Sequence, residues 1–96
     1  MTDKIRSDDV FGLARYYRFQ WEEAQDGYVL LFPEGMVKLN AGAGEVLKRV
    51  DGKKTVGEIV NELKATFPDV PDMEDDVMAM LELANGKAWI ERKTAP

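Results

Sequence analysis

Apolar and polar positions alternate between residues 16 and 21, and a two-residue period of this kind predicts a half-buried β-strand. Its apolar face carries three aromatic side chains, Tyr17, Phe19 and Trp21. Two further strands are expected, over the almost entirely apolar residues 28–32 and over residues 36–39. The intervening Asp26-Gly27 and Pro33-Glu34-Gly35 segments are turn signals. Three strands joined by short turns predict an antiparallel β-meander.

The chain beyond this meander follows a helical period and predicts three helices. Asn40 is placed to cap the first helix, and Thr55-Val56-Gly57-Glu58 is a capping box at the start of the second. Pro71-Asp72 starts the third helix, and Asn85-Gly86 ends it. Residues 88–90 are expected to be extended and to pack back on the helices. The expected fold class is α+β, a winged-helix-like three-helix bundle with an N-terminal three-stranded antiparallel β-meander.

Length and the placement of polar residues indicate a single small domain with two short flanking segments. The chain has 96 residues, which suffices for one domain. Residues 1–13 are polar and lack periodicity, so we expect a flexible N-terminal arm there. The domain is expected over residues 14–92, followed by a C-terminal tail at residues 93–96.

The composition narrows the chemistry that the chain can carry. With no histidine and no cysteine, catalysis would depend on carboxylates, lysine or tyrosine alone, so no catalytic residue, metal site or cofactor is expected. The net charge of −5 disfavours nucleic-acid binding, which needs a basic surface. No run approaches the roughly 18 apolar residues of a membrane span, and the N-terminus lacks an apolar signal segment. A cytoplasmic location without membrane binding is therefore expected.

Two clusters of side chains each have a structural and a chemical interpretation. Four carboxylates stand near the start of the third helix, where a metal site is conceivable: Asp72, Glu74, Asp75 and Asp76. Consecutive helical residues point in different directions, so stabilisation of the helix start by its dipole is the favoured interpretation. The aromatic residues of the first two strands could stack on nucleotide bases, but their alternation favours core packing.

The third expected strand, Met36-Val37-Lys38-Leu39, is followed by a helix, so nothing in the sequence pairs its far edge. It is either an ordinary sheet boundary, with Lys38 discouraging aggregation, or a docking edge for an extended peptide. Four residues of the third helix border its apolar stripe: Asp76, Met80, Leu83 and Lys87. They form either the margin of the core or one wall of a groove, and the spacing alone leaves both interpretations open.

A series of short fragments stands in a distinctive order along most of the chain. They are Leu31-Phe32-Pro33-Glu34-Gly35, Leu39-Asn40, Asp51-Gly52, Thr55-Val56, Glu58-Ile59, Val77, Leu81, Ala84 and Lys87-Ala88-Trp89-Ile90. Over about residues 15–92, their order and spacing resemble the pyrroloquinoline quinone (PQQ) biosynthesis protein D family. Ala88 and Ala84 stand where Gly and Leu are more usual in that family.

The resemblance implies a recognition element for a ribosomally synthesised and post-translationally modified peptide (RiPP). Such a peptide chaperone is not an enzyme: it binds the precursor peptide of PQQ and presents it to a radical-SAM maturase, which carries the iron–sulfur clusters. In this fold the leader peptide adds to the third strand and lies against the third helix. The resemblance thus implies a peptide-binding domain over residues 14–92 with a site formed by Met36, Val37, Lys38, Leu39, Asp76, Met80, Leu83 and Lys87.

Several alternatives stay open beside this interpretation. A winged-helix DNA-binding or transcription-regulator domain fits the helix order, although its recognition helix should be basic rather than acidic. One basic group is interpreted either as solvated helix ends or as a surface that contacts the maturase: Lys48, Arg49, Lys53 and Lys54. A free strand edge is compatible with both a monomer and a dimer.

Overall fold

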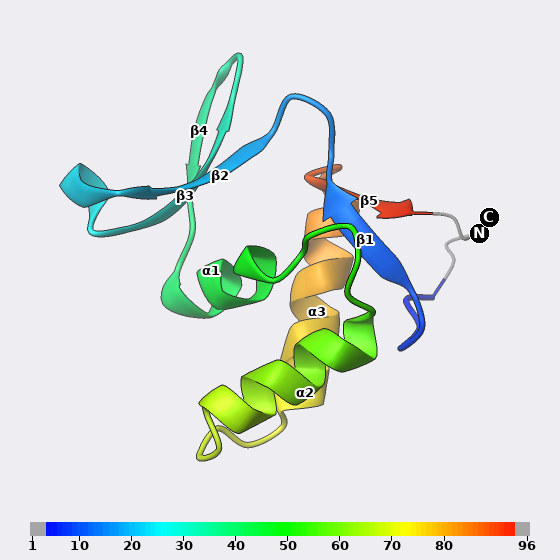
Figure 1. Ribbon diagram of the computed structural model, residues 1–96. Coiled ribbons are helices and arrows are strands. Elements are labelled where there is room, and N and C mark those ends of the chain that lie inside the picture. Colours follow the sequence, from blue (N-terminus) through cyan, green and yellow to red (C-terminus); the bar gives the residue numbers. More distant parts are fainter. Residues whose placement is uncertain (1–3, 94–96) are drawn as a thin grey trace.

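The computed structural model describes residues 4–93, which fold into two antiparallel sheets and three α-helices (Figure 1). The elements are β1 (Val10–Leu13), β2 (Arg18–Glu22), the 3-10 turn η1 (Glu23–Gln25), β3 (Gly27–Phe32), β4 (Gly35–Lys38), α1 (Ala41–Lys48), α2 (Val56–Thr66), α3 (Met73–Gly86) and β5 (Ile90–Lys93). One sheet has the order β2-β3-β4 and the other pairs β1 with β5. The expected α+β class, with a meander and three helices, is confirmed.

The meander forms where the alternating pattern and the turn signals predict it. Phe32 pairs with Gly35 across a two-residue Pro33-Glu34 turn, which sets the register of β3 against β4. Leu39 lies just beyond β4, yet its amide still donates to the carbonyl of Tyr28 at 3.0 Å. At the earlier turn, the residue with positive φ is Asp26 (52°) rather than the glycine that follows it.

The aromatic residues of β2 and β3 pack on one another across the strands, but core packing holds only in part, because Trp21 is 47% exposed and Tyr16, before β2, is 68% exposed. The rings of Phe19 and Tyr28 stack with centroids 4.7 Å apart, and Trp21 meets Tyr28 edge-on at 5.0 Å. Leu30 on the same face is fully buried beneath the helices. The meander is thereby attached to α1, while its tip extends away from the helices (Figure 1).

The three helices begin largely as their capping residues predict. Asn40 accepts a hydrogen bond from the Ala43 amide at 2.7 Å. Thr55 and Glu58 form both hydrogen bonds of the capping box, at 3.1 and 2.8 Å. The third helix differs, because Asp72 has a left-handed conformation (φ 56°) and its side chain caps nothing.

The core lies between the helices and receives side chains from both sheets. The largest fully buried side chains in it are Phe11, Leu30, Leu47, Val56, Ile59, Leu63, Val77, Leu81 and Ile90. No polar or charged residue is buried among residues 4–93. The apolar stripes predicted for the helices therefore define the inside of the domain.

The N-terminal segment departs from expectation. A flexible arm was predicted over residues 1–13, but Val10–Leu13 forms β1 and pairs with β5, and Phe11 is only 2% exposed. Lys93, expected in the tail, belongs to β5. Four residues are too short a stretch to show a period, and the partner strand lies at the other end of the chain. Residues 1–3 and 94–96, the rest of the predicted arm and tail, lie outside the described residues.

Candidate functional site

The outer edge of β4 is unpaired among residues 4–93, because β4 bonds only to β3. Hydrogen-bonded and non-hydrogen-bonded positions alternate along an antiparallel pair. Since the Leu39 amide bonds to β3, Val37 also faces β3, whereas the N–H and C=O groups of Met36 and Lys38 point to the open edge. β4 thus presents two residues with free backbone donors and acceptors to an extended partner.

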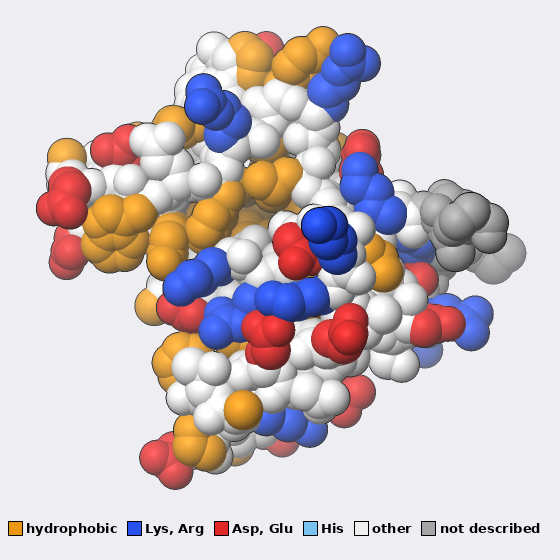
Figure 2. All heavy atoms as spheres, in the orientation of Figure 1, with side chains coloured by type: hydrophobic (Ala, Val, Ile, Leu, Met, Phe, Trp, Pro, Cys, Tyr) orange, Lys and Arg blue, Asp and Glu red, His pale blue; other side chains and the backbone are white. Residues whose placement is uncertain are grey.

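The side chains of this segment divide between the two faces of the sheet. Val37 and Leu39 are half-buried and pack against the core, while Met36 and Lys38 are exposed on the opposite face. Val37 and Leu39 therefore hold the strand in place, and Met36 and Lys38 are available for contact. Figure 2 shows hydrophobic side chains lining the hollow between the meander and the helices.

A groove opens next to the end of β4, between the start of α1 and the first half of α3. Its volume is about 430 Å³, and Asp76 and Met80 of α3 form one side of it. The other residues that line it are Ala41, Gly42, Ala43, Glu45, Val46, Leu63, Phe67, Val70, Met73 and Val77. Because most of these are apolar, the groove suits a hydrophobic side chain.

The predicted site residues are only partly brought together. Asp76 and Met80 lie beside Ala41 and Gly42, which follow β4 almost directly. Leu83 is 48% exposed and, like Lys87, lies outside the groove, nearer the end of α3. Their role in peptide binding stays a prediction.

Sequence reasoning missed the α1 and α2–α3 side of the groove. Two signals for it were present: the small residues Ala41-Gly42-Ala43 at a helix start, and an isolated apolar Val70 in a polar turn. Small residues leave space above a helix, and Val70 remains 44% exposed.

The basic group at the α1–α2 connection is largely engaged within the domain. Arg49 makes ion pairs with Glu45 at 2.9 Å and Glu62 at 3.2 Å, and Lys54 reaches Glu62 at 2.9 Å. The hydrogen bond from Lys54, followed by the charges of Lys54 and Arg49, holds the pKa of Glu62 below its usual value. Lys48 lies over the ring of Tyr28 at 5.9 Å. These contacts join α1 to α2 and to the meander; contact with a maturase stays a prediction.

Within the described part of the chain, no group of three or more acidic residues is arranged to hold a metal ion. Consecutive residues of a helix point in different directions, which sets the carboxylates at the start of α3 apart from one another. None of the helices over residues 4–93 has the length and apolar character of a membrane span.

Comparison with known proteins identifies the family. The model of the family described as "Coenzyme PQQ synthesis protein D (PqqD)" matches residues 27–90, which include β3, β4 and all three helices. The chain belongs to the PqqD family. The resemblance drawn from the short fragments is thereby confirmed, and the matched range contains the candidate site.

Curated relatives and a solved structure agree with this PqqD assignment. The chain is 55% identical over 84 residues to a "PqqA binding protein" of Pseudomonas aeruginosa strain UCBPP-PA14, covering 88% of the chain and 91% of the relative. It is 46% identical over 90 residues to a "PqqA binding protein" of Acinetobacter baylyi, covering 94% and 89%.

The solved structure is the solution NMR structure of the PqqD truncation of Methylobacterium extorquens PqqCD. It is described as a functional, stand-alone RiPP recognition element. The match has a TM-score of 0.75 and 36% identity, and it covers 92% of this chain and 95% of that one. The PqqD fold is therefore shared over nearly the whole domain, and nothing in these comparisons favours the DNA-binding alternative.

Proposed function

We propose that this chain is the peptide-recognition component of PQQ biosynthesis and binds the ribosomal precursor peptide by strand addition to β4. The observation that carries the proposal is the open β4 edge beside an apolar groove, in a member of the PqqD family. Relatives that share about half of its residues are named for binding PqqA. The chain acts as a binding partner, and the covalent chemistry belongs to another protein.

Strand addition explains how one short edge can hold a peptide of varied sequence. Met36 and Lys38 each offer one donor and one acceptor, so a partner strand gains about four hydrogen bonds. At about 0.5–1.5 kcal/mol each, these bonds contribute roughly 2–6 kcal/mol. Losing the free motion of the peptide costs about 4–15 kcal/mol. Backbone pairing alone is therefore insufficient, and side-chain anchors beside the strand are needed.

We further infer that the bound leader is presented to a radical-SAM maturase. A peptide held on a module that also docks on the enzyme has a raised effective concentration at the active site. The iron–sulfur clusters and S-adenosylmethionine belong to that enzyme, so this chain needs no cofactor of its own. Lys48 and Lys53 remain the exposed part of the basic group and are candidates for the enzyme contact.

The test replaces an outward-facing residue of β4 with proline. Lys38→Pro removes one donor from the open edge and leaves the β3–β4 bonds of Val37 and Leu39 intact. Calorimetric titration with the synthetic precursor peptide should show about a two- to tenfold loss of affinity, the equivalent of one such hydrogen bond. Lys38→Ala, which loses the side chain but keeps the backbone N–H, serves as the control, and the affinity of the proline variant is compared with it.

Circular dichroism must first show that Lys38→Pro is folded. A folded variant that binds the peptide as tightly as the wild type would contradict docking on β4. Absence of any binding by the wild-type chain would contradict the proposed function as a whole.

A further inference from the structure

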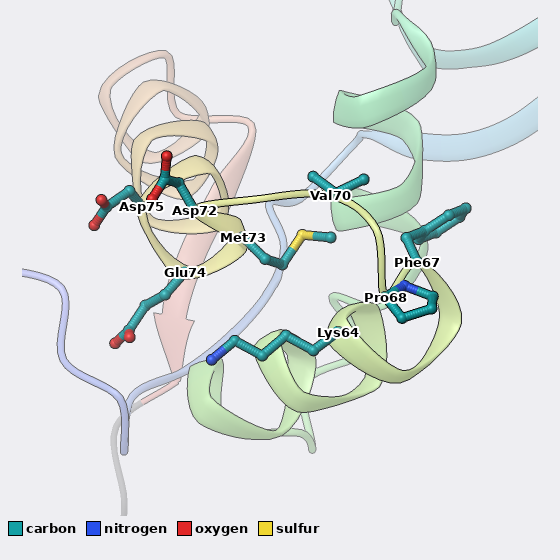
Figure 3. A pocket seen from close by; sticks show the side chains of 8 residues that line it. All are labelled: Lys64, Phe67, Pro68, Val70, Asp72, Met73, Glu74 and Asp75. Carbon is teal, nitrogen blue, oxygen red and sulfur yellow. The ribbon is translucent and has the colours of Figure 1, made fainter.

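The groove beside β4 continues into a second cavity under the α2–α3 turn. The second cavity measures about 490 Å³ and shares Phe67, Val70 and Met73 with the first. Figure 3 shows the Met73 side chain extending between Val70 and the stem of Lys64, with Phe67 and Pro68 on the far side. The shared side chains form an apolar floor that is common to both cavities.

The first groove carries negative charge at its rim. Two carboxylates line the first groove, Glu45 and Asp76. Glu45 is already paired with Arg49 at 2.9 Å, whereas the side chain of Asp76 makes no ion pair or hydrogen bond with residues 4–93. Asp76 is therefore the carboxylate available to a cation on a bound peptide.

The mouth of the groove is kept open by the small residues at the start of α1. A Cβ added to Gly42 would meet only the Oδ1 atom of Asn40, at 3.6 Å, so the space above Gly42 is free. A larger residue at this position would fill that space. Since Ala41 and Gly42 come three and four residues after the end of β4, a strand paired with β4 would end beside this mouth.

From these observations we propose a rule for the side chains that the site selects. The groove receives one hydrophobic side chain of the precursor peptide, from a residue just beyond those paired with β4. A Lys or Arg within about two residues of that anchor pairs with Asp76. The inference rests on the proposed function and specifies which segment of the peptide is recognised. The apolar floor and the unpaired carboxylate of Asp76 lie within one groove. One short peptide segment that carries a hydrophobic side chain and a cation can therefore contact both.

The anchor is tested by filling the groove. Gly42→Leu places a side chain in the free space and also raises helix propensity, so the domain should remain folded. Ala65→Leu, on the exposed face of α2 and outside both cavities, is the matched control. In fluorescence anisotropy with the labelled precursor peptide, Gly42→Leu should weaken binding about tenfold or more, as loss of a buried anchor does. Ala65→Leu should leave binding unchanged.

The ion pair is tested by neutralising Asp76 and then, one at a time, the Lys and Arg residues of the peptide. Asp76→Asn should weaken binding about two- to five-fold, as expected for a partly exposed ion pair. The control is Glu82→Gln, an exposed carboxylate on the same helix and outside both cavities, with little effect expected. Peptides in which each Lys or Arg is changed singly to Gln should include one that binds the wild type more weakly but binds Asp76→Asn unchanged.

The outcomes distinguish a failure of the groove rule from a failure of the proposed peptide-binding function. If Lys38→Pro loses affinity while Gly42→Leu and Asp76→Asn bind as the wild type does, docking on β4 stands and the groove rule is wrong. If Asp76→Asn and Glu82→Gln lose affinity equally, a general acidic field replaces the specific pair. If the wild-type chain does not bind the peptide, both the function and the rule are wrong.

Discussion

Gly44 of α1 lies directly against the ring of Tyr28 in β3. A Cβ added to Gly44 would come within 2.9 Å of Tyr28 Cδ2 and 3.3 Å of Tyr28 Cβ. Tyr28 is itself held between Phe19 and Trp21, so its ring cannot move aside without disturbing the meander. The close approach of α1 to the sheet, and with it the position of β4 relative to the groove, depends on the absence of a side chain at Gly44.

Gly44→Ala should therefore destabilise the domain even though alanine favours helices. Overpacking of a tight contact costs about 1–3 kcal/mol, which exceeds the roughly 1 kcal/mol gained in helix propensity. Gly42→Ala is the matched control, because it meets open space and should be neutral or stabilising. Urea unfolding followed by circular dichroism measures both changes. A Gly44→Ala variant more stable than the wild type would show that Tyr28 yields.

Ala88 ends α3 in a left-handed conformation, with φ at 61°. The Trp89 amide bonds to the Ala84 carbonyl at 2.9 Å and the Ala88 amide to the Asn85 carbonyl at 3.1 Å, which is the helix-ending motif that glycine favours. Ala88→Gly should stabilise the domain by about 1 kcal/mol, because the left-handed region costs an L-residue about 1–2 kcal/mol.

The same substitution at a helical residue without positive φ gives the control for this prediction. Ala65→Gly in the last turn of α2 should destabilise by up to about 1 kcal/mol, because glycine is the poorer helix former. Thermal unfolding compares the midpoints of the two variants with the wild type. Changes of the same sign in both would contradict the role assigned to the backbone at Ala88.

The sequence predicts best where neighbouring residues alone determine structure. The turn at Pro33-Glu34, the cap at Asn40 and the capping box at Thr55 depend on residues three or fewer apart, and all are present. The sequence could not show that Gly42 tolerates a side chain while Gly44 does not. Only the packing of α1 on β3 leaves space at Gly42 and encloses Gly44.

In the candidate site, too, the features set by neighbouring residues were predicted and those set by tertiary packing were missed. The unpaired edge of β4 was expected from strand order, since a helix follows that strand immediately. The groove was expected on α3 alone, and its other walls were missed, because Ala41 of α1 and Leu63 of α2 approach α3 only through tertiary packing. β1 was missed for the same reason: its partner β5 lies about 80 residues away in the chain.

Phe11 shows that the N-terminal strand is part of the core, and its loss should be costly. The ring is 2% exposed, and the guanidinium of Arg92 lies 5.4 Å from its centroid. Phe11→Ala should destabilise the domain by about 3–5 kcal/mol, the range for truncating a buried phenylalanine. Tyr16→Ala, which truncates a ring that is 68% exposed, should change stability by about 0.5 kcal/mol or less. If urea unfolding showed equal effects for Phe11→Ala and Tyr16→Ala, residues 10–13 would be a loosely attached arm and not part of the core.

Glu62 and Asp51 make the stability of the domain depend on pH in the acidic range. The pKa of Glu62 is lowered by the hydrogen bond and charge of Lys54 and by Arg49. The pKa of Asp51 is lowered by hydrogen bonds from the backbone amides of Lys54 and Lys53. A carboxyl whose pKa is lower in the folded state binds fewer protons there than when unfolded, so it stabilises the fold above its unfolded pKa. That stabilisation is lost as the pH falls from about 4.5 through the folded pKa values.

Glu62→Gln should therefore reduce the loss of stability that the domain shows as the pH becomes acidic. At pH 7 the variant should be less stable than the wild type, because it loses the ion pairs with Arg49 and Lys54. The difference should shrink as the pH falls from about 4.5 through the lowered pKa of Glu62, because the wild-type carboxyl then becomes protonated too. Glu82→Gln, which changes an exposed carboxylate of α3 without a described ion pair, controls for the loss of one negative charge. Thermal unfolding between pH 2.5 and 7 measures both. A stability difference for Glu62→Gln that is the same at every pH would contradict ionisation as its cause and point to packing instead.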